Sequence, residues 1–408
     1  MHAMQRKHEA CCQPQKNAMR KLLVLIPIAL VLLASCTKDG AMGGGMDSSP
    51  DAFSGSSGGG NGNGNGGGTG GVMTAGEWND LAQWDFWKTL MQRDTIKLYP
   101  GKWGFYLSNR VTVTLKDQSG KLIHDARIKL VYNGKSVTGV TSNDGRAELF
   151  PSVYEPNYTL DNFSLSAEYA GQHYDLGSWP ASQTSITKTI PVNKIVSNNL
   201  DIMFVVDATG SMGDEIRYLK DELLDVINRA GNQLPGVSIR MSSVFYRDHG
   251  DDYLTRPFNF TTNPSQLVSF INNQSAGGGN DFPEAVDEAL KTGMEQSWSD
   301  QARNRLLFLI LDAPPHDEQA VMGRLKTAVS QAMEKGIRII PISASGIDWE
   351  TEFLLRFLSI STNSTYVFIT DHSGIGNSHH TPTVGSYQVE YLNNLMVRLI
   401  TKYGQNMD

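Results

Sequence analysis

The chain is poor in cysteine and carries little excess charge, and both absences exclude classes of function. Among its 408 residues are three cysteines, at positions 11, 12 and 36, so no disulfide or thiolate metal site can form downstream of Cys36. The net charge of −7, with charged residues at 19%, argues against a nucleic-acid binder, which usually presents a basic face. After the Gly-rich tract, the sequence has no G-x-S-x-G elbow, H-E-x-x-H helix or Walker loop. We therefore expect a protein that binds a partner and is not an enzyme.

The longest apolar run lies close to the N-terminus. Residues 22–34 follow two basic residues, and this run of about 13 residues is shorter than the roughly 20 that a membrane-spanning helix needs. It ends in Leu-Ala-Ser-Cys at 33–36, which resembles the lipobox of bacterial lipoproteins. The resemblance implies a signal peptide over residues 1–35, with Met19 as an alternative start, and acylation of Cys36. The alternative is an ordinary secretory signal or a membrane anchor.

The residues after Cys36 bear on the membrane that would hold the lipid. Thr37 follows the cysteine, whereas an aspartate there resembles the inner-membrane retention signal of enteric bacteria. Lys38 and Asp39 resemble the surface-export signals of some Gram-negative lipoproteins. We expect a lipid anchor at Cys36 in the bacterial outer membrane, with the protein facing either the periplasm or the cell surface.

Two segments of different composition follow. Residues 36–73 are rich in Gly, Ser and Asn, which predicts a disordered, flexible linker averaging roughly 35 Å from end to end. Residues 74–103 are expected to form an amphipathic helix over 74–92 and a connector, because their apolar side chains recur at helical spacing. The three tryptophans of this helix either pack on the neighbouring domain or form a surface for a partner.

Residues 104–195 change to a period of two, which is typical of strands. Hairpin-turn pairs, Asn-Gly at 133–134 and Asp-Gly at 144–145, separate short apolar-polar repeats. We expect an all-β antiparallel sandwich with strands at 110–117, 126–133, 135–142, 146–150 and 163–170. The stretch 111–150 resembles the carboxypeptidase-regulatory-like, immunoglobulin-like sandwiches of bacterial surface proteins. This resemblance implies a spacer or support domain.

Strands and helices alternate from residue 199 to residue 404, which predicts an α/β fold with a doubly wound, mostly parallel sheet. The apolar runs at 200–207 and 305–312 are typical of strands buried on both faces. Other strands are expected at 237–248, 337–344 and 365–370. Helices are expected at 215–230, 264–273, 283–294, 320–335, 349–359 and 386–403.

Oxygen-bearing side chains gather where these strands end. Asp207 closes one buried strand and Thr209 and Ser211 follow at alternate positions, while Asp312 closes another strand. Ligands of such sheets lie at the carboxyl ends of the strands. Asp281 follows a run of glycines before the helix expected at 283, and it is either a further ligand or a cap of that helix. Thr209 and Ser211 also have a simpler interpretation, as caps of the helix that follows them.

Four stretches in order resemble the von Willebrand factor A family. These are DATGSM (207–212), YRDHGD (246–251), GGGNDFPEA (277–285) and LDAPPHD (311–317). The first resembles the D-x-[ST]-x-S metal-ion-dependent adhesion site. The resemblance implies a Rossmann-like fold and a divalent cation, Mg²⁺ or alternatively Mn²⁺ or Ca²⁺, at Asp207, Thr209, Ser211, Asp281 and Asp312. It also implies a partner that supplies a carboxylate to the cation. Asp248 and His316 are expected just outside this set.

One departure from the family concerns the middle loop, which often supplies a threonine where this chain offers Asp281. An additional carboxylate would lower the residual charge of the site, and so weaken capture of the partner or favour Ca²⁺ or Mn²⁺ over Mg²⁺.

Three functions are open at this point. The first is a cell-surface module that binds a protein or glycan through a cation. The second is a periplasmic assembly factor or a subunit of an envelope complex. A metal-dependent hydrolase is disfavoured, because His316 is the one candidate base near the predicted site.

Overall fold

The computed structural model describes residues 73–371 and 379–408. All of them belong to one compact unit. The predicted signal peptide, the lipidation site Cys36 and the linker up to residue 72 lie outside the described residues. No helix in the two described ranges combines the length and the apolar character needed to cross a bilayer.

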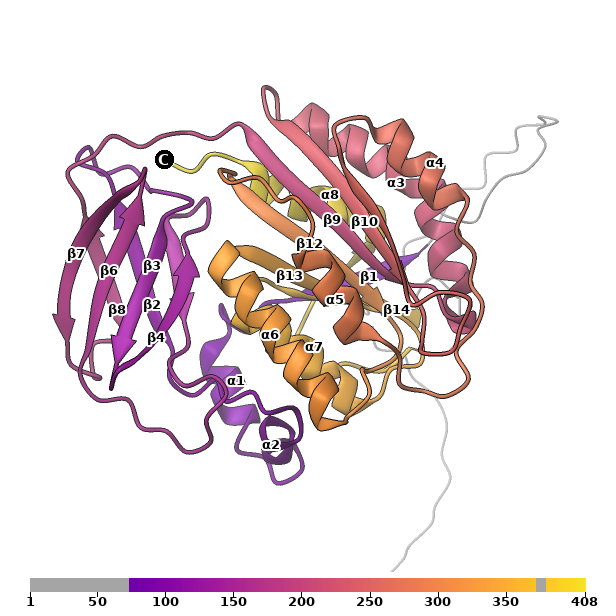
Figure 1. The fold of residues 1–408 in the computed structure, drawn as a ribbon, viewed down its shortest axis with the longest axis horizontal. Helices are drawn as coiled ribbons and strands as arrows, with labels where there is room; N and C mark the ends of the chain where they lie inside the picture. Colours follow the sequence, from indigo (N-terminus) through magenta and orange to yellow (C-terminus); the bar gives the residue numbers. More distant parts are fainter. Residues whose placement is uncertain (1–72, 372–378) are drawn as a thin grey trace, which may run out of the picture. The chain divides into compact units, whose positions relative to one another are not determined.

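An eight-stranded sheet forms the larger part of the unit, in the order β11-β10-β9-β12-β13-β14-β1-β15 (Figure 1). Its five central strands, from β10 to β14, are parallel, and β11 and β1 run antiparallel to their neighbours. The predicted mostly parallel sheet is therefore confirmed. The strands span Thr74–Trp78 (β1), Asn199–Asp207 (β9), Ser238–Tyr246 (β10), Thr255–Thr261 (β11), Asn304–Leu311 (β12), Ile337–Ser343 (β13), Tyr366–Thr370 (β14) and Val389–Tyr391 (β15).

Helices cover both faces of this sheet. One apolar cluster joins the sheet to α5, α6 and α7, and a second joins the opposite face to α3, α4 and α8. This arrangement buries β9 and β12 on both sides, as their continuous apolar sequences predict. The helices span Gly213–Gln233 (α3), Pro264–Asn272 (α4), Val286–Met294 (α5), Gln319–Lys335 (α6), Trp349–Ser361 (α7) and Leu392–Gly404 (α8).

The helix predicted over 74–92 is wrong for its first half. Residues Thr74–Trp78 form β1, which pairs on one side with β14 and on the other with β15. A Cβ at Gly76 would come within 2.6 Å of the Phe368 ring, so this strand needs a glycine at that position. A helix forms only over Trp84–Leu90 (α1). Pairing with two distant strands therefore overrides the local helical spacing.

The sandwich domain is thus inserted between two strands of the same sheet. Of the three tryptophans, Trp78 and Trp87 are buried, and Trp87 lies edge-on against Phe357 of α7 at 5.6 Å. Packing, not a free surface, accounts for these two side chains.

A buried ion cluster fixes the segment after β1 to α7. The side chains of Asp80 and Arg356 are both fully buried and make two hydrogen bonds, at 2.9 and 2.7 Å. Glu352, one turn before Arg356, accepts a third hydrogen bond from the same guanidinium at 2.9 Å. The cluster connects residues that are 276 positions apart in the sequence.

Two smaller sheets, β5-β2-β8 and β4-β3-β6-β7, share one apolar core and form the predicted sandwich. The five predicted strands are present, at Val111–Lys116 (β2), Arg127–Tyr132 (β3), Lys135–Val140 (β4), Arg146–Leu149 (β5) and Phe163–Tyr169 (β6). Two further strands were not predicted, Gln172–Trp179 (β7) and Ser185–Thr189 (β8). The pairing of β2 with β8 is parallel, so the sandwich is not wholly antiparallel as expected.

The sandwich contacts the large sheet near the amino ends of its strands. Asp125 pairs with Arg305, the second residue of β12, at 2.7 Å. A Cβ on Gly336, just before β13, would touch Val140 of β4. These contacts leave the sandwich at the opposite edge of the sheet from the carboxyl ends of β9 and β12.

Candidate functional site

Asp207 and Asp312 meet at the carboxyl edge of the sheet because their strands are neighbours. Strands β9 and β12 are parallel, and Val206 lies opposite Ile310. Asp207 is the last residue of β9, and Asp312 directly follows the last residue of β12. Asp207 is therefore level with Leu311, and Asp312 lies one residue further along the neighbouring strand. Because adjacent strands are about 4.8 Å apart, the two aspartates lie close together.

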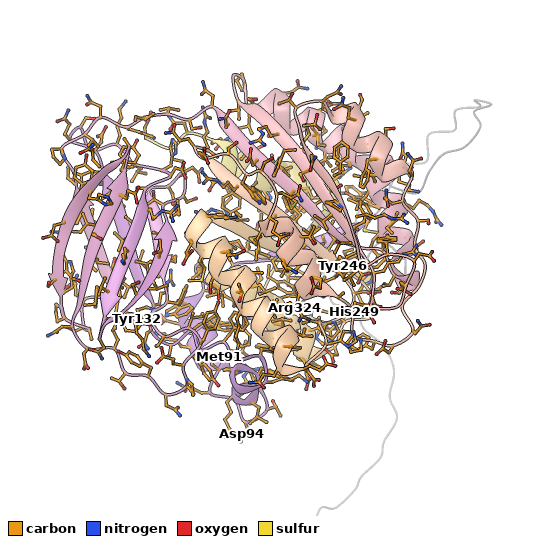
Figure 2. All side chains as sticks on the ribbon, in the orientation of Figure 1. Met91, Asp94, Tyr132, Tyr246, His249 and Arg324 are labelled. Carbon is orange, nitrogen blue, oxygen red and sulfur yellow. The ribbon has the colours of Figure 1, made fainter. Side chains whose placement is uncertain are left out.

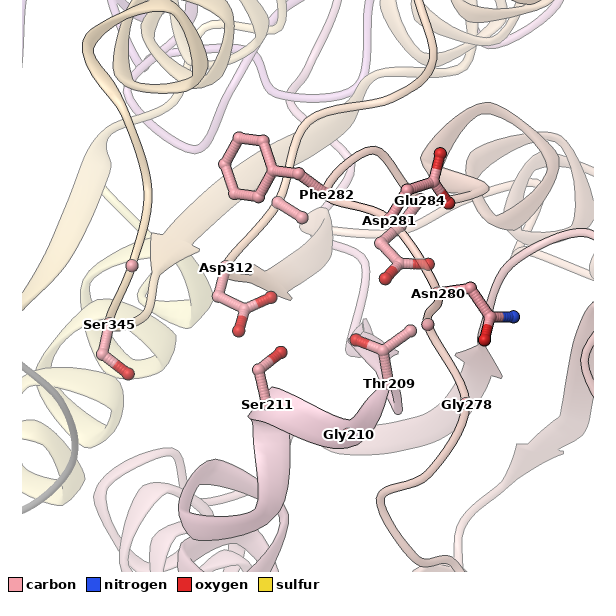
Figure 3. Close-up of a pocket in the computed structure, with 13 residues that line it drawn as sticks. Thr209, Gly210, Ser211, Gly278, Asn280, Asp281, Phe282, Glu284, Asp312 and Ser345 are labelled. Atoms are coloured by element: carbon pink, nitrogen blue, oxygen red, sulfur yellow. The ribbon is translucent and has the colours of Figure 1, made fainter.

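A pocket of about 380 Å³ opens above this edge. Figure 3 shows the hydroxyls of Thr209 and Ser211 and the carboxylates of Asp281 and Asp312 arranged around its centre. Four of the five predicted ligands therefore line one cavity. Asp207 lies beneath it and is fully buried.

The carboxylate of Asp207 is satisfied on one side only. The backbone N–H and the hydroxyl of Thr209 donate to Oδ1 at 2.9 and 2.7 Å. Oδ2 is buried and accepts no hydrogen bond of ordinary geometry from the described residues, although the Tyr246 hydroxyl lies close enough to lower the pKa of this carboxyl. Burial, together with the charge of Asp312, raises the pKa of Asp207 to about 7. Burial also raises the pKa of Asp312, an effect that Ser211 partly offsets.

Backbone hydrogen bonds hold the loops around the pocket together. The N–H of Gly210 donates to the carbonyl of Gly278 at 3.1 Å, and that of Gly277 donates to Ala208 at 3.0 Å. The carboxylate of Asp251 accepts from the N–H of Gly279 at 3.0 Å. Gly278 and Gly279 have φ values of +81° and +72°, a conformation that favours glycine. The glycine run thus brings the middle loop against the loop that carries Thr209 and Ser211.

The capping interpretations fail for three residues. Helix α5 begins at Val286 with Ala285 as its N-cap, so Asp281 lies too far from the helix to cap it. The short 3-10 turn at Gly210–Met212 and helix α3 have no side-chain cap hydrogen bond. The hydroxyls of Thr209 and Ser211 therefore face the pocket without serving as helix caps.

Glu284 belongs to this site and was not predicted. Its side chain lines the pocket, the residue is 3% exposed, and Oε2 has no partner within the described part of the chain. Burial, and then the charges of Asp207 and Asp248, raises its pKa to about 9. The glutamate of the GGGNDFPEA stretch was a signal that could have found it.

Asp248 and His316 pair with each other beside the site. Nε2 of His316 lies 2.9 Å from Oδ1 of Asp248, and neither residue lines the pocket. Burial lowers the pKa of His316, but the hydrogen bond to Asp248 and the charges of Asp248, Glu318 and Asp281 together outweigh it, so the pKa is raised. Tyr246 and His249, labelled in Figure 2, belong to the strand end and loop that carry Asp248.

The donor set suits a hard divalent cation. Carboxylates and hydroxyls are oxygen ligands, which Mg²⁺, Mn²⁺ and Ca²⁺ prefer. Oδ2 of Asp207 accepts no hydrogen bond of ordinary geometry from the described residues, so its lone pairs are available to a cation. Within 73–371 and 379–408, no three His, Cys, Asp or Glu side chains are grouped closely enough to hold a metal. A cation here would therefore bind directly to fewer than three of these side chains as they lie in the structure, and would complete its coordination with hydroxyls and water.

The free energy of unfolding of the cation-free protein is expected to fall as the pH rises from about 4 to about 7, because the pKa of Asp207 is higher in the folded chain than in the unfolded chain. The unfolded chain releases this proton near pH 4, while the folded chain keeps it to about 7. Glu284, with its pKa raised to about 9, extends the decline to higher pH. Urea unfolding in chelator at several pH values measures the slope, and Asp207→Asn should reduce it. If the pH dependence of the free energy of unfolding were unchanged in that variant, the raised pKa assigned to Asp207 would be wrong.

Comparison with known proteins bears on the part of the chain that forms the large sheet. The model described as von Willebrand factor A domain matches residues 201–376. An ariadne-like RING finger protein of Acanthamoeba polyphaga mimivirus is 31% identical over 117 residues, which are 29% of this chain and 11% of that protein. The alpha-protein kinase vwkA of Dictyostelium discoideum is 29% identical over 122 residues, or 29% of this chain and 19% of the kinase. The chain thus spans a fifth or less of these relatives.

A solved von Willebrand factor type A protein from Catenulispora acidiphila is 11% identical, with a TM-score of 0.35, over 70% of this chain and 51% of that one. The family match begins within β9 and extends past β14, and it includes the predicted ligands Asp207, Thr209, Ser211, Asp281 and Asp312. Residues 201–376 of this chain are a von Willebrand factor A domain.

Proposed function

We propose that this chain is a cell-envelope lipoprotein whose A domain binds a protein or glycan partner through a divalent cation. The observation that carries the proposal is the gathering of the Thr209 and Ser211 hydroxyls and the Asp312 carboxylate around one pocket, beside the buried Asp207, whose Oδ2 accepts no hydrogen bond of ordinary geometry from the described residues. When bound, the cation would offer an open coordination position to an oxygen ligand of the partner.

The residues of the site would contribute to cation binding in different ways. Asp207 and Asp312 supply negative charge, and the hydroxyls of Thr209 and Ser211 supply neutral oxygen. Thr209 also donates to Asp207 Oδ1 and so orients the carboxylate. Asp281 lines the pocket and is proposed as a further ligand, directly or through water.

Two features favour binding over catalysis. His316, the candidate base, is held by Asp248 at 2.9 Å and does not line the pocket. Phe282, which lines the pocket, is 45% exposed, so a macromolecule could reach the site.

The proposed anchor rests on the sequence alone. Acylation of Cys36 would attach the chain to the outer membrane, and the Gly-rich linker would hold the folded domains away from the lipid. Labelling cells with radioactive palmitate should mark the native chain and not Cys36→Ser. Protease treatment of intact cells would then separate a surface position, where the chain is cleaved, from a periplasmic one, where it is protected.

Calorimetric titration of the purified full chain with Mg²⁺, Mn²⁺ and Ca²⁺ tests the cation site. We expect a single-site isotherm with at least one of the three, abolished by chelator. Absence of heat and of any thermal stabilisation with all three cations would contradict the proposed function.

A further inference from the structure

The loops around the pocket are rich in acidic residues and poor in basic ones. They comprise residues 207–215, 247–252, 278–284, 312–318 and 345–350. Each contains at least two Asp or Glu, and in the sequence of these five stretches Arg247 is the one Lys or Arg. Arg247 is buried and donates to the backbone carbonyls of Ala208 and Ser275 at 3.1 and 2.9 Å. Of these acids, Asp281, Asp317 and Glu318 are exposed, and they form a negative rim at the carboxyl edge.

Several of these acids are free to act on a partner. Asp317 and Glu318 are exposed, and Glu318, the N-cap of α6, makes no side-chain cap hydrogen bond. Asp281 lines the pocket itself. A cation would neutralise part of the charge at the centre, but the rim would still repel an acidic surface and attract a basic one.

Two large apolar side chains are exposed at the same edge. Phe282 lines the pocket and is 45% exposed, and Trp349 is 49% exposed at the start of α7. Ser345 and Gly346, which also line the pocket, lie three to four residues before Trp349. Phe282 thus lines the cavity, and Trp349, the first residue of α7, directly follows a loop whose residues Ser345 and Gly346 line it.

Trp349 is held in place rather than free to rotate. Its ring packs edge-on against His380, with ring centroids 4.5 Å apart. Nε2 of His380 lies 2.9 Å from Glu352, which is fully buried and also bonded to Arg356. An aromatic side chain that is both exposed and pre-positioned loses little freedom when a partner covers it, as is typical of interface anchors.

We propose that this edge docks a protein segment in which an acidic residue is flanked by Lys or Arg and by a large apolar side chain. The acidic residue enters the pocket, the basic residues face the rim formed by Asp281, Asp317 and Glu318, and the apolar side chain packs on Phe282 and Trp349. This inference rests on the proposed function, because the acidic residue needs the cation to approach so negative a surface.

The probe is a displayed library of linear peptides with a fixed central aspartate and randomised flanks, selected on the immobilised full chain in Mn²⁺. We expect enrichment of Lys or Arg and of aromatic or aliphatic residues in the flanks. Phe282→Ala and Trp349→Ala should each weaken the best resynthesised peptide about tenfold. Ile195→Ala, a control of similar exposure at 50% near the amino end of β9, should leave its affinity unchanged. Asp317→Asn with Glu318→Gln should reduce the enrichment of basic flanks.

Titration of each variant with Mn²⁺ separates the two possible failures. If the unchanged chain binds no Mn²⁺, the proposed function itself is wrong. If Mn²⁺ binds but no peptide is enriched, or the flanks are acidic or random, the inference is wrong and the cation site stands. Equal loss of affinity in the Ile195→Ala control would likewise contradict a specific role for Phe282 and Trp349.

Discussion

Replacing Asp207 with asparagine is expected to abolish divalent-cation binding while leaving the protein folded. The substitution keeps the shape of the side chain and the two hydrogen bonds that Oδ1 accepts from Thr209, but it removes the charge of a fully buried ligand. Because the metal-free carboxylate is strained by burial, the variant should unfold at an equal or higher urea concentration in chelator. Titration calorimetry with Mn²⁺ and Mg²⁺ measures the loss.

Two further variants sharpen this result. Asp312→Asn should weaken the cation at least tenfold, since it removes the second carboxylate of the proposed set. Asp248→Asn is the matched control, because Asp248 pairs with His316 and does not line the pocket. Undiminished Mn²⁺ binding by Asp207→Asn would remove Asp207 from the site.

Replacing Asp80 with alanine is expected to lower the free energy of unfolding by about 3–5 kcal/mol. The change leaves the fully buried guanidinium of Arg356 without its bidentate partner, and Glu352 remains as its one carboxylate. It also releases the chain just after β1, so the edge of the sheet should exchange amide hydrogens faster. Urea unfolding and hydrogen exchange at β1, β14 and β15 are the measurements.

The exposed pair Asp85–Lys88 supplies the control for this prediction. Its side chains are 95% and 57% exposed, and the N–O distance of 2.7 Å is as short as in the buried pair. Asp85→Ala should have no measurable effect on the urea midpoint. A similar effect of both substitutions would show that burial does not determine the strength of the Asp80–Arg356 pair.

The central part of the site could be predicted because it follows from local sequence. β9 and β12 are continuous apolar runs, so their ends, and with them Asp207 and Asp312, are fixed by hydrophobicity alone. Parallel neighbours then bring those ends to one edge. Thr209 and Ser211 follow one strand end directly, and their separation from Asp207 depends on a short turn.

The parts that sequence reasoning missed depend on contacts between distant segments. β1 pairs Thr74 with Thr370, and nothing within residues 74–92 records that partner. β11 contains Pro257, which lowers the strand signal and is tolerated because the strand lies at the sheet edge. Glu284 joins the site because its backbone N–H donates to Pro314 at 2.9 Å, across two loops. Such pairings are set by the assembled fold rather than by local pattern.

Anomalous diffraction from crystals of the full chain grown with Mn²⁺ tests the central claim most directly. We expect one strong manganese peak in the pocket, with oxygen atoms of Asp207, Ser211 and Asp312 within about 2.5 Å or bridged by a single water. A fully occupied peak elsewhere, or none in this pocket at a Mn²⁺ concentration that saturates the calorimetric isotherm, would contradict the account.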